Sequence, residues 1–260
     1  MQKHPPSRGF NRAAILQLLR RKKFLSRSEL AQLSGLSQAS VSRITKELMD
    51  EGLVVERGLG RSTGGRPRIH LCLNETRYRA IGIDLHDWQT RFSVSTLDGR
   101  IVESHCFSTA SDPYQTMASI VEHAEAYRAA HKEYEVVGIG VGSRGFVNAR
   151  TGVVERGSDP TWQQIPLGPY LREHLGIPVY VDNVVRAAAL AEYHHGDVAI
   201  QGAHCLIFVQ VDEGIGVGMM LDGATYYGPS MAAGEFGQMV IAETKDTARH
   251  DRSGCLEMLA

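Results

Sequence analysis

The 260-residue chain is almost neutral, with 28 Lys and Arg against 29 Asp and Glu, but its charges are unevenly placed. Through Leu73 there are 14 basic and 5 acidic residues, a net of +9, which leaves 14 against 24, a net of −10, for the rest. A cationic segment ahead of an anionic body favours a polyanionic partner for that segment. Four scattered cysteines, no signal peptide and no apolar run of about 18 residues argue against secreted and membrane-spanning classes and predict a cytoplasmic chain.

The first segment predicts two helices joined by a short connection. Residues 11–21 carry apolar side chains at helical spacing. The string SRSE at residues 26–29 has the form of a capping box, which starts a second helix with Leu30 and Leu33 facing inward. Gly35 suits the tight turn that ends this helix, because glycine tolerates the left-handed conformation there.

A third helix is predicted from an N-cap at Ser37 to Asp50, with Val41, Ile44 and Leu48 on one apolar face. Its opposite face carries the side chains we expect to reach DNA: Gln38, Ser42, Arg43 and Lys46. Two helices joined by a tight turn, the second polar outside, are typical of a helix that enters the major groove. Gln38 and Arg43 are the candidates for base edges. An ordinary three-helix bundle with a charged surface remains the alternative at this point.

Residues 52–74 predict two β-strands around a glycine-rich tip. That tip and its flanks present arginines that can reach phosphates or a narrow minor groove: Arg57, Arg61, Arg66 and Arg68. A wing of this kind, added to the helices, favours DNA binding over a plain bundle. The sequence therefore predicts a winged helix-turn-helix DNA-binding domain over residues 1–74, with double-stranded operator DNA as its partner.

From about Tyr78 apolar runs alternate with helical stretches, and Asp98-Gly99 marks a hairpin turn, so residues 75–260 predict an α/β body. Several motifs occur in order along the chain: GGRPRIHL (64–71), IGIDL (81–85), GIGVGSRGFVNARTGVV (138–154), IPVYVDN (177–183), RAAALAE (186–192), AGEFGQM (233–239) and GCLE (254–257). On these motifs the chain resembles the ROK family of repressors and sugar kinases, in its transcriptional-regulator branch.

The resemblance implies an actin-like (ribonuclease H-like, sugar-kinase type) body of two lobes behind the winged helix. Regulators of this branch bind operators as oligomers and respond to a sugar or a phosphotransferase partner. Relatives continue for on the order of a hundred residues past the position of Ala260. We therefore expect a C-terminally short chain whose second lobe is incomplete and leaves apolar surface exposed.

Two glycine-rich phosphate loops of the family kinases are altered. After the first strand the kinases have two glycines and a threonine behind the aspartate, whereas Asp84 is followed by Leu85, His86, Asp87 and Trp88. The second loop carries a carboxylate at Glu213, where a hydroxyl is expected. Side chains and negative charge at both places oppose the close approach of phosphate. The resemblance also places the catalytic aspartate of the kinases at Val184, which cannot accept a proton. Asp182, on a strand, should point to the opposite face, so we expect no kinase activity.

The family's zinc ligands fall at Gln238, Ala248, His250 and Cys255, and two remaining donors cannot make a four-ligand shell. No metal and no cofactor are therefore predicted. The other cysteines, Cys72, Cys106 and Cys205, lie in apolar surroundings and are predicted to be buried. The pair His194-His195 is expected to end the helix that carries RAAALAE.

The resemblance places three sugar-contacting positions at Asn183, Glu235 and Glu257, while Val184 and Gln238 replace two further contacts. The alternatives are structural: a strand-end turn for Asn183 and a turn carboxylate beside Gly234 for Glu235. We thus predict a non-enzymatic DNA-binding regulator, a repressor of carbohydrate-utilisation genes that acts as a homodimer and binds a small sugar effector. The alternatives are a truncated, constitutive DNA binder and a ROK sugar kinase.

Overall fold

The computed structural model of the chain describes residues 8–59, 69–196, 203–212, 214–242 and 254–259. Two compact units make up the chain. The first comprises residues Met1–Ala80, Val94–Glu103 and Arg128–Val137, and the second comprises Ile81–Ser93, Ser104–Tyr127 and Gly138–Ala260.

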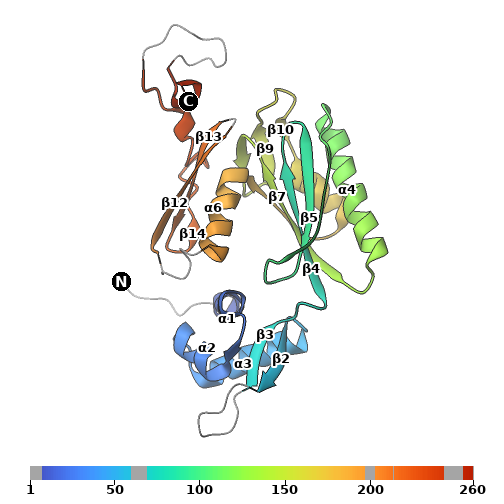
Figure 1. The fold of residues 1–260 in the computed structure, drawn as a ribbon, viewed down its shortest axis with the longest axis vertical. Helices are drawn as coiled ribbons and strands as arrows, with labels where there is room; N and C mark the ends of the chain where they lie inside the picture. Colours follow the sequence, from blue (N-terminus) through green and yellow to red (C-terminus); the bar gives the residue numbers. More distant parts are fainter. Residues whose placement is uncertain (1–7, 60–68, 197–202, 213, 243–253, 260) are drawn as a thin grey trace. The chain divides into compact units, whose positions relative to one another are not determined.

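The first unit begins with three helices and a small antiparallel sheet, the winged helix-turn-helix that the sequence predicts (Figure 1). Its elements are α1 (Arg8–Lys22), β1 (Leu25–Ser26), α2 (Arg27–Ser34), α3 (Gln38–Asp50), β2 (Val54–Leu59) and β3 (Ile69–Leu73). The sheet order is β1-β3-β2, so β3 lies between the other two strands.

The helix boundaries follow the local capping signals. Ser26 Oγ accepts the Glu29 backbone N–H, and a Glu29 carboxylate oxygen accepts the Ser26 N–H at 2.8 Å, which completes the capping box. Gly35 ends α2 with φ of 69°, and Ser37 caps α3. The expectation that Leu33 faces inward was wrong, since it is 50% exposed. The inward face of this two-turn helix is centred on Leu30 and Ala31 instead.

A single apolar core holds the first unit together. It includes Ile15, Leu30, Val41, Ile44 and Leu71, each of which is at most 1% exposed. Each such side chain contributes about 1.5–3 kcal/mol by leaving water.

Two residues beyond the wing also join this unit. Leu97 packs against the same core, and the Tyr78 hydroxyl donates to the Glu51 carbonyl at 2.6 Å. The first unit therefore continues past the end of the wing.

The second unit is an α/β fold around a five-stranded sheet of order β11-β7-β4-β5-β6. These strands are β4 (Tyr78–Leu85), β5 (Gln89–Ser95), β6 (Ile101–Ser108), β7 (Glu135–Ser143) and β11 (Val179–Asn183), and the first unit includes one end of each of the first four. The β5–β6 hairpin turns at Gly99, with φ of 91°, as expected. The unit also contains the helices α4 (Pro113–Ala130) and α5 (Leu167–Leu175). A separate small sheet consists of β8 (Phe146–Asn148), β9 (Val153–Arg156) and β10 (Gln163–Ile165).

A third sheet, β12-β13-β14, packs one face on α6. The elements here are α6 (Val184–His195), β12 (Cys205–Val211), β13 (Ile215–Leu221), β14 (Ala224–Thr225), η1 (Phe236–Gln238) and α8 (Leu256–Leu259). The approach is close, because a Cβ on Gly218 would lie 2.5 Å from that of Ala189. His194 and His195 form the last turn of α6, as predicted.

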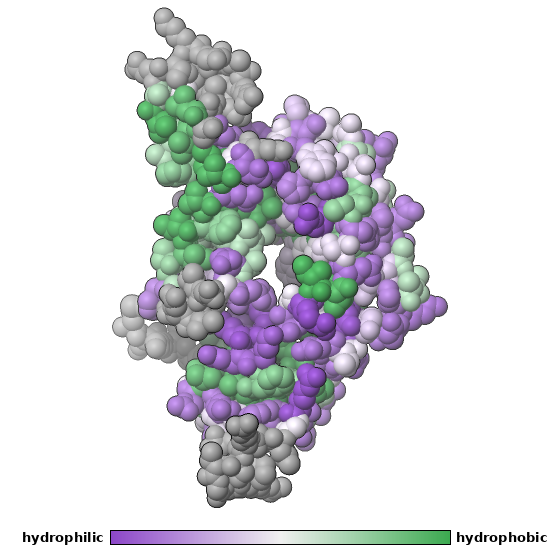
Figure 2. Space-filling view, in the orientation of Figure 1, coloured by the Kyte–Doolittle hydropathy of each residue, from purple (hydrophilic) through white to green (hydrophobic). Residues whose placement is uncertain are grey.

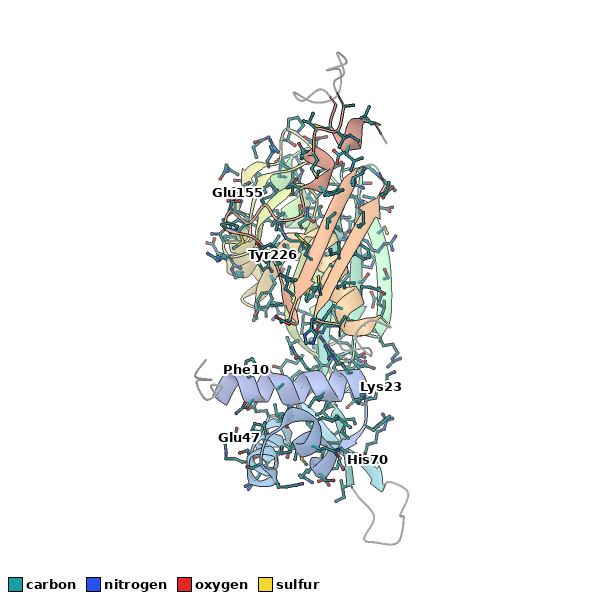
Figure 3. The ribbon with its side chains drawn as sticks, turned by 90° about the vertical axis from the view of Figure 1, so that its left-hand side faces the viewer. Phe10, Lys23, Glu47, His70, Glu155 and Tyr226 are labelled. Atoms are coloured by element: carbon teal, nitrogen blue, oxygen red, sulfur yellow. The ribbon has the colours of Figure 1, made fainter. Side chains whose placement is uncertain are left out.

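The outer face of this sheet leaves apolar side chains exposed, as the sequence predicts for an incomplete second lobe. Ile207, Val209 and Val211 on β12 are 54–67% exposed. Hydrophobic surface gathers on the left of the space-filling view, over the strands β12 and β13 (Figure 2). Seen face on, the two long strands lie in front of α6 (Figure 3). Every helix in the part of the chain that the structure describes is too short or too polar to cross a membrane.

Two of the three cysteines expected inside are exposed. Cys72 is buried, but Cys106 on β6 and Cys205 on β12 are exposed. Cys205 lies on the face of its sheet opposite to the one that packs on α6, and most residues of β6 are exposed. Which face of a strand is covered depends on segments distant in the sequence, and this is why the prediction was wrong.

Candidate functional site

The outward face of α3 gathers the predicted DNA-reading side chains of the helix. Gln38, Ser42, Arg43 and Lys46 are all exposed, whereas Val41, Ile44 and Leu48 are buried. The helix thus separates a core face from a polar face along its whole length. This separation holds the polar residues at fixed positions on a packed element, which is the arrangement that groove reading requires.

Arg43 is held by a single ion pair on its own helix. Its guanidinium lies 3.0 Å from the Glu47 carboxylate, and its side chain is 54% exposed. Such exposed i,i+4 pairs contribute about 0.3–0.5 kcal/mol. A phosphate or a guanine edge can therefore replace Glu47 at small cost.

A polar contact that the sequence analysis missed joins the two helices of the motif. Thr45, fully buried in α3, donates to the Val41 carbonyl at 2.8 Å and accepts Arg27 Nε from α2 at 3.3 Å. Arg27 also pairs with Glu56 on β2 at 3.2 Å. Arg27 thereby links α2, α3 and the wing strand.

The wing is present as the antiparallel pair β2 and β3. Arg57 lies over the Phe24 ring, 5.8 Å from its centroid. Arg61, Arg66 and Arg68 lie outside the described residues, so their contact with DNA remains a prediction.

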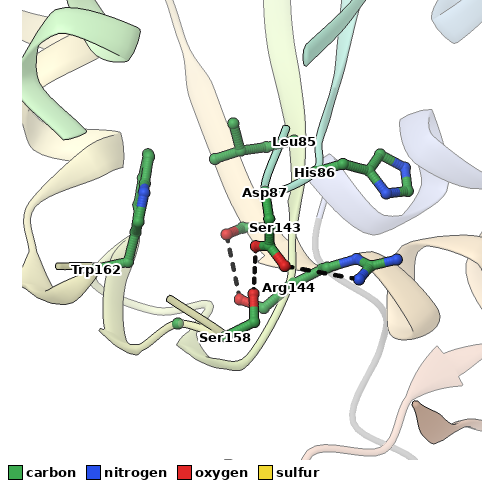
Figure 4. A pocket seen from close by; sticks show the side chains of 8 residues that line it. Leu85, His86, Asp87, Ser143, Arg144, Ser158 and Trp162 are labelled. Carbon is green, nitrogen blue, oxygen red and sulfur yellow. Dashed lines mark hydrogen bonds and ion pairs between the residues drawn. The ribbon is translucent and has the colours of Figure 1, made fainter. Parts of the chain in front are cut away.

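In the second unit, a pocket forms where β4 and β7 end (Figure 4). Its lining residues are Leu85, His86, Asp87, Ser143, Arg144, Gly157, Ser158 and Trp162. Ligands of open α/β sheets bind beyond the carboxyl ends of the strands. The pocket lies at such a position, next to the loop whose phosphate-binding glycines are replaced.

Asp87 is engaged within the protein. Its carboxylate accepts the Ser158 hydroxyl and lies 3.8 Å from the Arg144 guanidinium (Figure 4). Arg144 also lies 4.0 Å from Asp212. A carboxylate with its own partners therefore lines this pocket, and its effect on phosphate binding stays a prediction.

A carboxylate of the protein also lies in the second altered loop, at the turn of Gly214 and Ile215. The Ile215 N–H donates to the Glu257 carboxylate at 2.9 Å. A Cβ on Gly214 would lie 3.0 Å from that carboxylate, so the turn is built around it. Glu213 lies outside the described residues. The amide that could bind a phosphate in this turn is thus already paired with an anion.

At the junction of β11 and α6, a buried arginine ties several segments together. Arg186 is 2% exposed and binds Asp182 through Nε at 2.7 Å. Its other nitrogens donate to the carbonyls of Val147 and Met231 at 2.7 and 3.2 Å. The Tyr227 hydroxyl donates to the second Asp182 oxygen at 3.1 Å. The sequence analysis missed this network, since its hydrogen-bonded pairs lie up to 45 residues apart.

The expectation that strand alternation turns Asp182 away from the position of Val184 was wrong. Residues two apart on a strand share a face, and Val184 is already the first residue of α6. It lies beside Gly142, where a Cβ would be 3.6 Å from the valine methyl. The Asp182 carboxylate is instead paired with Arg186 and Tyr227.

Asn183, the first predicted sugar contact, caps α6. Its side-chain oxygen accepts the N–H groups of Val185 and Arg186 at 2.9 and 3.3 Å, and its nitrogen donates to the Gly145 carbonyl at 2.9 Å. Asn183 is thus an N-cap, while its contact with a sugar stays a prediction. A sugar at Asn183 has to share or displace these bonds.

The other two predicted contacts lie within electrostatic reach of each other. Burial raises the pKa of the Glu235 carboxyl, and the Glu257 charge adds to that effect, while Arg186 and Arg156 oppose it. Glu235 as a whole residue is exposed. Its carboxylate is nevertheless partly desolvated by neighbouring protein atoms, which disfavours the charged form. Glu235 and Glu257 thus lie close enough for their charges to interact, and their contact with a sugar stays a prediction.

The remnant of the family's metal site does not fit zinc. The buried Cys255 thiol donates to the Gln238 carbonyl at 3.6 Å, and Gln238 supplies an amide where a histidine is required. Ala248 and His250 lie outside the described residues. Among the residues that the structure does describe, no three potential ligands gather around one point.

Comparison with known proteins agrees with these features. A profile of the ROK family matches residues 80–260, and a profile described as winged helix-turn-helix DNA-binding matches residues 11–55. The chain belongs to the ROK family.

Named relatives include repressors. The chain is 30% identical over 264 residues to the xylose repressor of Caldicellulosiruptor bescii, which covers 100% of the chain and 66% of that protein. It is 27% identical to the DNA-binding transcriptional dual regulator NagC of Escherichia coli, over 96% of the chain and 62% of NagC. The chain therefore spans slightly less than two thirds of the length of these relatives.

Solved structures give the same picture. A ROK family transcriptional regulator, a homolog of the E. coli MLC protein, superposes with a TM-score of 0.81 at 26% identity, over 97% of this chain and 64% of that one. A ROK family glucokinase from Streptomyces griseus, in complex with glucose and AMPPNP, gives 0.61 at 25% identity, over 70% and 57%. The fold with the winged helix included is thus shared with that regulator, and the body alone is shared with the glucokinase.

Proposed function

We propose that the chain is a DNA-binding transcriptional regulator that represses carbohydrate-utilisation genes, with a sugar as its effector and without kinase activity. The observation that carries the proposal is the exposed polar face of α3 on a packed helix-turn-helix followed by a wing. Residues 1–74 are the proposed DNA-binding part and residues 75–260 the effector part. Its place of action is the cytoplasm, where the operator DNA is.

The test of DNA binding is a titration of the purified chain against the region upstream of its own gene cluster, at several salt concentrations. Arg43→Ala should weaken binding about 5- to 150-fold, the range for one lost base contact. Arg91→Ala is the matched control, because Arg91 is an exposed arginine on β5 in the second unit. Equal affinity of the two variants, or no binding above that to unrelated DNA, would contradict the proposal.

A sugar effector is supported by the nearby carboxylates of Glu235 and Glu257 and by the names of relatives, which specify xylose and N-acetylglucosamine. We propose that the sugar shifts the population between two states of the regulator that differ in operator affinity. The measurement is operator affinity with xylose or N-acetylglucosamine added. Glu235→Gln should abolish the response to sugar and leave DNA binding in the absence of sugar unchanged. Indifference of the wild type to both sugars would leave a constitutive DNA binder.

The proposal that the chain is not a kinase is supported by three residues. Asp87 and Glu257 place carboxylates at the two loops that correspond to the phosphate loops of the kinases, and Val184 stands at the position of their catalytic base. Incubation with ATP and glucose or xylose should give no phosphorylated sugar above a protein-free blank. Turnover that is lost on changing Asp182 to Asn would overturn this part.

A regulator that reads a two-fold symmetric operator needs two recognition helices. We therefore propose a homodimer as the DNA-binding form.

A further inference from the structure

One arginine lies between the two loops that correspond to the phosphate loops of the kinases. Arg144 follows β7, and its Nη1 atom lies 3.8 Å from a carboxylate oxygen of Asp87, on the loop after β4. Its Nη2 atom lies 4.0 Å from a carboxylate oxygen of Asp212, on the loop after β12. All three residues belong to the second unit. One guanidinium thus faces a carboxylate from each of the two altered loops, and we call these three residues the Arg144 link.

The Arg144 link is joined to the wall of the pocket. The Asp87 carboxylate also accepts the Ser158 hydroxyl, from the connection between β9 and β10 (Figure 4). Ser158 and Arg144 line the same pocket as Trp162, which is 6% exposed. A movement of the Asp87 loop away from Arg144 would therefore also change the surroundings of this tryptophan.

The arginine is more deeply covered than the carboxylates beside it. Its side chain is 18% exposed, against 41% for Asp87 and 59% for Asp212. Isolated exposed ion pairs contribute little to stability, but here one covered cation serves two anionic loops. Without the guanidinium, two carboxylates that now share a cation would repel each other. The charge of Arg144 therefore changes a repulsion between the loops into an attraction.

We propose that Arg144 is a positioning residue whose charge holds the two altered loops together, in the place that a nucleotide takes between the phosphate loops of the kinases. The link consists of groups of the chain itself. The loops are therefore held together without ATP, and the part of the site beside them is assembled before any ligand binds.

The inference deepens the proposed function, and only its consequence for the sugar rests on that function. Gly145 follows Arg144, and its carbonyl accepts the Asn183 amide at 2.9 Å. Asn183 is one of the three predicted sugar contacts. A displacement of the segment that carries Arg144 would thus reach this residue through one hydrogen bond, so sugar binding should weaken when the link is broken.

Tryptophan fluorescence can report on the link, because the chain has two tryptophans and both lie beside it. Trp88 follows Asp87 and is 65% exposed, whereas Trp162 lines the pocket. Trp88→Phe replaces an exposed side chain and leaves Trp162 as the single reporter. In this background Arg144→Gln should shift the Trp162 emission to longer wavelength and raise its quenching by acrylamide, because the loops separate and water reaches the indole. Unchanged emission and quenching would overturn the proposal.

Two further variants separate charge from shape. Arg144→Lys keeps the positive charge on a side chain of different shape, so it should keep the emission of the parent protein. Arg150→Gln is the matched control, because Arg150 is an exposed arginine in the turn after β8. A red shift in Arg144→Lys as large as that in Arg144→Gln would overturn the proposal, since the shape of the side chain and not its charge would then hold the loops.

Salt gives a measurement that needs no arginine variant. The Debye length falls from about 10 Å at 0.1 M salt to about 3 Å at 1 M salt. Acrylamide is uncharged, so salt does not screen its approach. Quenching of Trp162 should therefore rise with sodium chloride in the Trp88→Phe protein. The same protein with Asp87→Asn and Asp212→Asn, which has no carboxylates to link, should show no such rise. Equal salt dependence of the two proteins would overturn the proposal.

A sugar titration separates this inference from the proposed function. With xylose or N-acetylglucosamine as the probe, binding to the wild type should be the same with and without MgATP. It should be about 5-fold weaker in Arg144→Gln, the size expected for a partly exposed charge pair. A requirement for MgATP would overturn the inference. Indifference of the wild type to both sugars would contradict the proposed effector, and the fluorescence of Trp162 would still decide for or against the link.

Discussion

The α3 face and the β11–α6 junction carry similar polar residue types in opposite states. On α3, Gln38, Ser42 and Lys46 are exposed. At the junction, Arg186 and Asp182 bind each other and surrounding groups. Exposed polar groups can exchange water for a ligand at little cost, whereas the junction groups are already desolvated and paired. Availability, and not residue type, therefore separates a recognition surface from an internal brace.

The largest expected effect on stability follows from removing Arg186, which holds the β11–α6 junction together. Arg186→Ala should reduce the free energy of unfolding by about 3–5 kcal/mol, because Asp182 and two carbonyls lose a buried partner. Urea unfolding followed by circular dichroism measures it. Arg91→Ala should stay within about 0.5 kcal/mol of the wild type, since Arg91 is exposed. A tolerated Arg186→Ala would show that the junction is as replaceable as a surface.

On α3 the same kind of truncation should affect binding and leave stability unchanged. Lys46→Ala should lower affinity for all DNA sequences alike and reduce the salt slope by about 1, as for a phosphate contact. Gln38→Ala should relax the preference for one base pair by about 1–3 kcal/mol. Fluorescence anisotropy with matched and mismatched duplexes separates these results. A sequence-specific loss in the Lys46 variant would exchange the two assignments.

A smaller effect concerns the start of the recognition helix. Ser37 Oγ accepts the Ser40 N–H at 3.2 Å, so Ser37→Ala should cost about 1 kcal/mol of stability. Its effect on DNA affinity should follow only from that loss. Ser37→Asp keeps an acceptor and should restore the stability, although its charge should oppose DNA. Thermal unfolding of the two variants without DNA measures the cap alone.

The smallest expected effect is a pH dependence at a histidine pair in the second unit. His123 Nδ1 lies 3.1 Å from His105 Nε2, and its ring stacks on Phe107. Burial lowers the pKa of His123, and the nearby His105 lowers it further. The unfolded chain therefore binds this proton more readily, and stability should fall as the pH drops below the ordinary value of 6.5.

Unfolding free energies at about pH 7.5 and 5.5 should thus differ less in His123→Phe than in the wild type. His174→Phe is the control, because His174 is an exposed residue of α5 with its own stacking partner, Tyr170. An unchanged pH dependence in the His123 variant would place the titration elsewhere.

What the sequence predicts well is local. The capping box at Ser26, the turn at Gly35 and the cap at Ser37 each depend on residues within four positions, and each occurs as predicted. The family motifs predict the order of strands and helices in the body for the same reason, since each motif is a short segment.

What the sequence does not predict depends on distant partners. Asp87 meets Ser158 across 71 residues, and Arg27 meets Glu56 across 29. No periodicity records such pairs. The wrong predictions, Leu33, Cys106 and Cys205, concern which side of an element faces water, and packing against distant segments decides this.

The bond between Tyr78 and Glu51 also bears on how such regulators can be recombined. A chimera that joins this winged helix to another body at residue 74 keeps Glu51 but loses the tyrosine hydroxyl and the Leu97 side chain that covers the core. The transplanted head would have an exposed apolar spot and a carbonyl without its donor. An exchange of winged-helix domains within the family should therefore succeed when residue 78 and the tip of the β5–β6 hairpin are transferred together with the helices. The segment that has to be exchanged is thus discontinuous in sequence.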